Sequence, residues 1–252
     1  MLVDSHCHMD FPEFSDELDL VVARAGEVGV LHMLTICTQV TKFQQVREVA
    51  GRFDNIWCSV GVHPHNVESE PETSSEDLMA LADDPKVIAF GETGLDFYYE
   101  HSPREQQERS FRAHINASRL LGLPVIVHSR DADEDMIRVL RDEYARGPFP
   151  GVIHCFSSGG EMAATALELG LYISISGIIT FKTAEDRAEL ELQIGRVYEM
   201  METDKGLKSA VKHFEKYAKK YRKDPEQTAR VVEALSRAGV DLKKLNKKKN
   251  RR

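Results

Sequence analysis

Short apolar runs alternate with amphipathic stretches along the first 204 residues of the chain. The runs are rich in β-branched side chains and predict eight strands, at residues 2–4, 31–37, 56–60, 87–90, 124–127, 152–153, 171–175 and 197–201. The stretches between them predict helices at 18–25, 42–52, 104–121, 133–146 and 161–169. Most of these helices end before a glycine, which is typical of a helix C-terminus.

Strands that alternate with helices favour an α/β fold with a parallel sheet. The strands are apolar along their whole length, which indicates burial on both faces of the sheet. Eight such units in 252 residues fit a closed (β/α)8 TIM barrel best, and a doubly wound open sheet is the alternative. Neither a GxGxxG fingerprint nor a P-loop is present.

The net charge of the chain changes from negative to positive near Asp204. The formal charge of residues 1–204 is −20 and that of 205–252 is +12, which gives the total of −8. We therefore expect three parts, namely a barrel at 1–204 with an atypical last βα unit, a lysine-rich helical segment at 205–242 and a basic disordered tail at 243–252. An acidic barrel excludes a uniformly basic nucleic-acid binder, although metal ions can hold phosphates in place of lysine and arginine.

Composition also bears on the compartment. No apolar run reaches the roughly 18 residues that a membrane-spanning helix needs, and residues 1–10 lack the apolar centre of a signal peptide. The four cysteines form no CxxC pair and are expected to be free thiols. These features predict a cytoplasmic protein that has no membrane partner.

Residues that commonly bind metals follow the predicted strands. His6 and His8 follow the first strand and point to one side, because residues two apart on an extended chain share a side. The later strands are followed in turn by Glu92, His128, His154 and Asp204. In a barrel the carboxyl ends of the strands meet on one face, where active sites lie. Imidazole and carboxylate groups bind divalent cations, so the pattern predicts a metal site on that face.

The motifs in this order resemble those of the TatD family of metal-dependent deoxyribonucleases, which are amidohydrolase-like metallohydrolase barrels. The matching segments are Ser5-His-Cys-His8, Gly61-Val-His-Pro-His65, Gly91-Glu-Thr-Gly-Leu-Asp-Phe97, Pro124-Val-Ile-Val-His-Ser-Arg130 and His154-Cys-Phe156. The resemblance extends over residues 1–186, and the segment 202–204 also matches.

The resemblance implies a site that holds two divalent metal ions, which could be Mg²⁺, Mn²⁺ or Zn²⁺. The implied metal ligands are His6, His8, Glu92, His128, His154 and Asp204. Glu92 would bridge the two ions, and Asp204 would also handle the attacking water, so these two are the expected catalytic residues. Substrate contacts are expected from His63, His65, Arg130 and Lys182.

The implied function is that of a metal-dependent deoxyribonuclease, a hydrolase that cleaves phosphodiester bonds in DNA by two-metal activation of water. The family suggests 3′–5′ exonuclease activity, single-stranded 3′ ends as the DNA partner and RNA as a second partner. The aromatic run from Phe97 to Tyr99 either stacks on unpaired bases or packs as a barrel loop.

The sequence departs from the family pattern after Asp204, where Lys205-Gly-Leu-Lys-Ser209 replaces the usual Pro-Tyr-Leu segment. This departure leaves two alternatives open. One is a metal-binding or interaction protein without turnover, because its C-terminus is replaced. The other is a metallohydrolase that acts on a small amide or ester. Metal-dependent cleavage of DNA would distinguish the nuclease from both alternatives.

Overall fold

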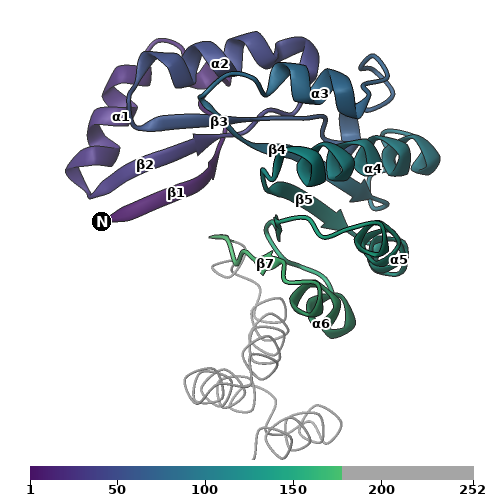
Figure 1. Ribbon diagram of the computed structural model, residues 1–252. Coiled ribbons are helices and arrows are strands. Elements are labelled where there is room, and N and C mark those ends of the chain that lie inside the picture. The colour runs from purple at the N-terminus through teal and green to yellow at the C-terminus, as the bar shows by residue number, and fades with distance from the viewer. Residues whose placement is uncertain (178–252) are drawn as a thin grey trace, which may run out of the picture. The chain divides into compact units, whose positions relative to one another are not determined.

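The computed structural model describes residues 1–177 (Figure 1). Contacts divide the chain into two compact units, one formed by Met1–His154 with Leu169–Ser174 and the other by Cys155–Glu168 with Ile175–Arg252. The predicted eighth strand, the lysine-rich helical segment and the basic tail lie outside the described residues, and so do Lys182 and Asp204.

Seven parallel strands form one sheet in the order in which they occur in the chain. They are β1 (Leu2–Cys7), β2 (Val30–Thr35), β3 (Ile56–Val60), β4 (Val87–Asp96), β5 (Val125–Arg130), β6 (Gly151–Ile153) and β7 (Tyr172–Ile173). Sequential order throughout is that of a curled TIM-barrel sheet, whereas a doubly wound sheet reverses its order at a switch point. The predicted barrel fold is therefore confirmed, and the doubly wound alternative is wrong.

Helices connect successive strands. They are α1 (Leu18–Glu27), α2 (Phe43–Arg52), α3 (Ser75–Leu81), α4 (Arg104–Leu121), α5 (Asp133–Ala145) and, in the second unit, α6 (Gly160–Glu168). Three short 3-10 turns occur at Pro12–Phe14, Val40–Lys42 and Pro64–Asn66. Connections between neighbouring parallel strands are right-handed, so helices of a sequentially ordered sheet collect on one face, as α1 to α5 do in Figure 1.

The main core lies between this face of the sheet and the helices. Ile56 and Val60 of β3 pack there with Phe90 of β4, Phe43 of α2 and Leu78 of α3, and all five are buried. Alternate residues of a strand point to the opposite face. On that face Ile36, Ala89 and Ile126 form a smaller buried cluster. Both faces of the central strands are thus apolar, as their uninterrupted hydrophobic sequences predict.

Two elements differ from the sequence-based expectation. β4 continues past Phe90 to Asp96, so Glu92 lies inside this strand and does not terminate it. Helix α3 is not among the predicted helices; it begins with a capping box between Ser74 and Asp77. A Ser-x-x-Asp pattern can satisfy the free N–H groups at a helix start, so the start of this helix could be predicted from the sequence.

Two glycines allow the strands to approach each other near Glu92. A Cβ atom on Gly94, whose φ is +141°, would lie 2.0 Å from the carbonyl oxygen of His128. A Cβ atom on Gly61 would lie 2.6 Å from the Cα of Gly91. No side chain fits at either position, so glycine is required where β4 passes its neighbours.

The four cysteines are free thiols, as predicted. Among the helices within residues 1–177, none combines the length and the apolar character that crossing a bilayer requires.

Candidate metal centre

Glu92 is the centre of a cluster of histidines that come from four other strands or the loops after them. It lies in β4, is buried, and places its two carboxylate oxygens on different partners. Oε2 is 3.2 Å from Nε2 of His6 in β1, and Oε1 is 3.0 Å from Nδ1 of His128 in β5. The structure therefore brings together residues that are up to 122 positions apart, because the carboxyl ends of parallel strands meet.

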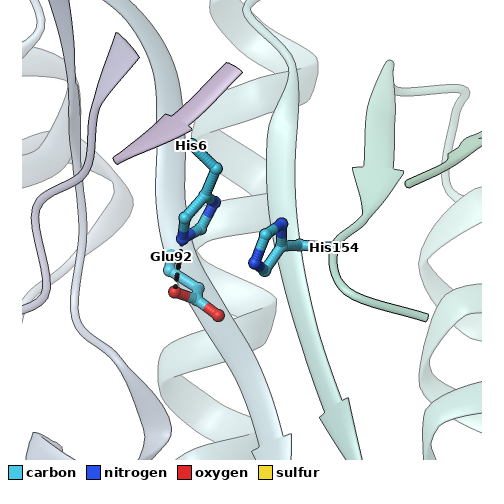
Figure 2. Close-up of side chains that lie close together, drawn as sticks. All are labelled: His6, Glu92 and His154. Carbon is cyan, nitrogen blue, oxygen red and sulfur yellow. Dashed lines mark ion pairs between the residues drawn. The ribbon is translucent and has the colours of Figure 1, made fainter. Parts of the chain in front are cut away.

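One potential ligand group consists of His6, Glu92 and His154, whose candidate ligand atoms all lie within 4.8 Å of one another. Figure 2 shows the three side chains, with the imidazoles of His6 and His154 face to face beside the carboxylate. Their ring centroids are 3.4 Å apart and the rings are nearly parallel, at 8°. His154 comes directly after β6. The group therefore joins side chains from strands β1, β4 and the end of β6, which are not neighbours in the sheet order.

A second potential ligand group consists of His63, Glu92 and His128, which meet the same 4.8 Å criterion. His63, in the loop after β3, lies with Nε2 3.3 Å from Nδ1 of His128 and 3.9 Å from Oε1 of Glu92. Glu92 is common to both groups and faces each with a different oxygen. This is the arrangement that a carboxylate bridging two cations requires.

Unpaired polar atoms occur at the carboxyl end of β1 and in the residues that follow it. Among the described residues, four buried side-chain nitrogen or oxygen atoms lack a hydrogen-bond partner, and three of them are Nδ1 of His6, Nδ1 of His8 and Oδ1 of Asp10. A buried polar atom without a partner costs about 1–3 kcal/mol, so such atoms point to a missing partner. Each of these atoms can donate a lone pair to a cation, and His6 belongs to the first group, so the chemistry of the donors fits a metal ion.

His8 belongs to neither three-residue group. Its ring lies edge-on to that of His6 at 5.2 Å and stacks on Phe11 at 4.9 Å. It follows the last residue of β1 and faces the same region as His6, as the spacing of two predicts. The structure thus places His8 next to the site, while the first three-residue group is completed by Glu92 and His154.

The protonation of the histidines suits cation binding. Burial lowers the pKa of His63 to about 3 and that of His154 to about 4, so both rings are neutral near pH 7 and keep a lone pair. Burial also opposes ionisation of Glu92, but hydrogen bonds from His128 and His6 outweigh it and hold the pKa of this carboxyl well below its usual range. The site therefore presents the carboxylate anion of Glu92 beside the neutral imidazoles of His63 and His154.

His128 differs from its neighbours because it lies between two carboxylates. Burial would lower its pKa, but hydrogen bonds to Asp96 and Glu92 outweigh burial and raise the pKa to about 9. Without a cation, His128 is the positive partner of both acids. A metal ion supplies positive charge at the same place, so the proton and the ion are alternatives there.

Asp96 is the site residue that sequence reasoning missed. Its side chain is fully buried, and Oδ2 lies 2.7 Å from Nε2 of His65 and 2.9 Å from Nε2 of His128. Oδ1 accepts the backbone N–H groups of Tyr98 and Tyr99. The signal lay in the strand period, because residues 92, 94 and 96 of one strand point to the same side. Because the predicted strand ended at Phe90, Asp96 was not recognised as lying on the same face as Glu92.

We expect Asp96→Asn to lower metal affinity or turnover about 10- to 100-fold, the usual cost of losing an acid that orients a metal-binding histidine. Asparagine keeps the size of the side chain but removes the charge that holds His128 and His65 in place. Metal titration and kcat measured on the same preparation would check this. Asp131→Asn, which removes an acid just after the end of β5, is the matched control and should change neither value. Unchanged metal affinity and turnover in Asp96→Asn would contradict an orienting role.

The loop that carries His63 and His65 is tied to α4. The backbone N–H of Val62 donates to Nε2 of the buried His114 at 3.1 Å, and Nδ1 of that ring donates to the carbonyl of Ser110. Burial lowers the pKa of His114 to about 4, so the ring stays neutral and can make both contacts. Ser102 donates to the carbonyl of His65. This loop is therefore held by a buried network.

Arg130, predicted to contact substrate, ends β5 and lies over two aromatic rings near the site. His63 and His65 also lie near the Glu92 cluster, and their roles as substrate contacts stay predictions. Asp204 and Lys182 lie outside the described residues, so their predicted roles as ligand and phosphate contact remain predictions.

Comparisons with known proteins agree with this geometry. The sequence model of the TatD-related DNase family matches residues 3–250, a range that includes the lysine-rich segment. A curated relative from Escherichia coli K12, named uncharacterized metal-dependent hydrolase YcfH, is 40% identical over 215 residues, which cover 84% of this chain and 80% of the relative. A second relative, from Salmonella typhimurium, is named 3′–5′ ssDNA/RNA exonuclease TatD and is 34% identical over 192 residues, covering 76% and 72%.

Among solved structures, the TatD homologue YJJV from Escherichia coli K12 aligns with a TM-score of 0.68 at 24% identity. The alignment covers 94% of this chain and 97% of that chain, and it supports the barrel fold. The chain belongs to the TatD-related DNase family and is a metal-dependent hydrolase with the TIM-barrel fold of that family.

Proposed function

We propose that this protein is a metal-dependent 3′–5′ exonuclease that hydrolyses phosphodiester bonds at single-stranded DNA ends. The observation that carries the proposal is the position of Glu92 between two groups of histidines, one at each carboxylate oxygen. A phosphodiester is anionic and resists attack by neutral water, so a pair of adjacent cation positions suits this bond. The exonuclease name of the Salmonella relative supports the same choice of substrate.

The residues proposed to hold two divalent cations, with Mg²⁺, Mn²⁺ and Zn²⁺ as candidates, are His6, His8, Glu92, His128, His154 and Asp204. When bound, the pair of cations would lower the pKa of a water molecule and offset charge on the phosphate. Asp204 is proposed to take the proton of the attacking water. Glu92 would hold the two positions at a fixed separation, because its oxygens face opposite partners.

His63 is proposed to donate a hydrogen bond to the substrate. Its Nδ1 accepts the backbone N–H of His65 at 3.2 Å, so the proton of the neutral ring lies on Nε2. That nitrogen points toward Glu92 and His128, where a phosphate oxygen would lie. The loop therefore favours a tautomer that donates to substrate over one that binds a cation. His65, Arg130 and Lys182 are the other proposed substrate contacts.

The test is cleavage of a 5′-labelled single-stranded DNA oligonucleotide. With Mg²⁺ or Mn²⁺ we expect stepwise shortening from the 3′ end, and a chelator should stop it because the site then lacks its charge. Restoring the metal should restore the rate. An oligonucleotide blocked by a 3′-terminal phosphorothioate linkage serves as the control and should be cut slowly.

Other outcomes would contradict the proposal in different ways. Hydrolysis of small amides or esters without cleavage of DNA would indicate a different metallohydrolase. A folded, metal-loaded protein that cleaves none of these substrates would indicate that the chain binds metal without turnover. Shortening from the 5′ end would leave the nuclease assignment intact and overturn its polarity.

A further inference from the structure

Two tyrosines extend the site beyond its histidines. Tyr98 and Tyr99 follow β4 after one intervening residue, and the carboxylate of Asp96 accepts both of their backbone N–H groups, at 3.1 and 3.0 Å. The other oxygen of the same carboxylate contacts His65 and His128. One buried acid thus holds the tyrosine turn and the site histidines, so the distance between them is fixed by the fold.

Both tyrosine rings are exposed despite their size. Tyr98 is 57% exposed and Tyr99 is 48% exposed. The two rings meet edge to face at 4.8 Å, and Tyr99 stacks on His101 with nearly parallel planes. A packed barrel loop would bury such rings, because each buries a large apolar area when covered. Exposed aromatic rings that are held in place indicate a surface for a ligand.

Arg130 adds a positive charge to this surface. Its guanidinium carbon lies 4.2 Å from the ring centroid of Tyr98 and 4.8 Å from that of Tyr99. It forms no ion pair with a carboxylate within residues 1–177, whereas Arg112, Arg119 and Arg138 all do. A guanidinium that, among the described residues, stacks on rings and pairs with no carboxylate keeps its hydrogen-bond donors for an incoming anion.

An aromatic face beside an arginine matches the chemistry of an unpaired nucleotide. The base has an apolar face that stacks on a ring, and the phosphate accepts hydrogen bonds from a guanidinium. Within a duplex the faces of the bases are already covered by their neighbours. An unpaired base can therefore stack on an exposed ring, whereas a base inside a duplex cannot.

We propose that Tyr98, with Tyr99 and Arg130, forms a subsite that stacks one unpaired base of the substrate and contacts its phosphate. This inference rests on the proposed function and specifies how that site would choose single strands. Tyr98 supplies the open ring face, and Arg130 covers part of both rings and faces the phosphate. The chemical class of ligand is a single-stranded nucleic acid, and the surface itself does not distinguish deoxyribose from ribose.

The experiment measures binding separately from cleavage. A fluorescein-labelled single-stranded oligonucleotide with phosphorothioate linkages, which slow hydrolysis, is titrated with the full chain in Mg²⁺, and anisotropy gives Kd. A second oligonucleotide carries abasic sites at its three terminal 3′ positions. Tyr98→Ala should weaken binding of the first oligonucleotide roughly 5- to 150-fold, the range for losing one stacked base. It should leave binding of the abasic oligonucleotide unchanged.

Two further variants serve as controls. Tyr98→Phe keeps the ring face and should bind both oligonucleotides as the unmodified protein does. Tyr172→Ala removes an exposed tyrosine at the start of β7, the end of the strand remote from the site, and should change nothing. Equal affinity of Tyr98→Ala and the unmodified protein for the base-bearing strand would overturn the subsite, as would equal weakening for both strands.

The two proposals fail separately. Binding that depends on Tyr98, without any cleavage of an unmodified oligonucleotide, would support the subsite and contradict the exonuclease. Cleavage that is unaffected by Tyr98→Ala in both KM and kcat would support the exonuclease and contradict the subsite.

Discussion

Glu92→Gln is expected to lose hydrolysis by more than about 100-fold and to lose bound metal. Removing an acid that merely orients a metal-binding histidine already costs about 10- to 100-fold, and Glu92 faces both candidate cation positions itself. Glutamine preserves the shape of the side chain but removes the negative charge at the centre of the histidine cluster. Metal content measured by atomic emission and kcat on single-stranded DNA would check the expectation.

The fold of Glu92→Gln should persist. Glutamine has the same shape, keeps one acceptor oxygen for one of the two imidazoles, His6 or His128, and presents its NH2 group to the other ring, which can accept through a neutral nitrogen. Far-UV circular dichroism should match that of the unmodified chain. Glu143→Gln, which alters a buried carboxylate outside the site, is the matched control and should retain its metal. Full metal content with normal kcat in Glu92→Gln would show that Glu92 bridges nothing.

Glu143→Ala is expected to destabilise the protein by about 3–5 kcal/mol. The side chain of Glu143 in α5 is 1% exposed and accepts hydrogen bonds from Arg112, Arg119 and Arg146 at 2.8–3.0 Å. Two of these arginines belong to α4, so the acid links neighbouring helices across the outer layer. Alanine would remove the shared anion and leave three guanidinium groups near one another without their partner.

Urea denaturation of the chelated protein would measure this loss, because bound metal would otherwise add to the stability of the folded state. The matched control is Asp19→Ala, which breaks the ion pair between Asp19 in α1 and Arg52 in α2. Both side chains of that pair are largely exposed, so its loss should cost less than about 1 kcal/mol. A similar small effect in Glu143→Ala would mean that the arginines find other acids, among them Glu108 and Asp142.

The local pattern of the sequence was enough to predict most elements. β3 spans 56–60 as predicted, and α4 spans Arg104–Leu121 between a proline and Gly122, whose φ is +71°. Such signals are local, because a proline, a glycine or a hydrophobic period acts within a few residues. The positions of His6, His8, His128 and His154 near strand ends could likewise be predicted from the sequence. The motifs that contain these histidines carry the resemblance to the TatD family.

The second half of β4 could not be predicted from local sequence signals. This half, Gly91-Glu-Thr-Gly-Leu-Asp96, is neither uniformly apolar nor rich in β-branched residues, yet it remains a strand because Thr93, Gly94 and Asp96 pair with β5. Pairing partners lie more than 30 residues away, so no local rule contains them. The strand thereby directs Glu92 and Asp96 to the same face of the sheet, and Asp96 is the acid that sequence reasoning missed.

The sequence by itself determined the alternation of strands and helices and the presence of potential metal ligands near strand ends. Both follow from patterns that extend over only a few residues. Only the tertiary structure decided that the strands follow one another in order, that Glu92 offers one oxygen to each histidine group, and that Tyr98 and Arg130 lie together beside Asp96. The physical reason is that these arrangements depend on strand pairing and burial between distant segments, whose energies arise only when the sheet is assembled.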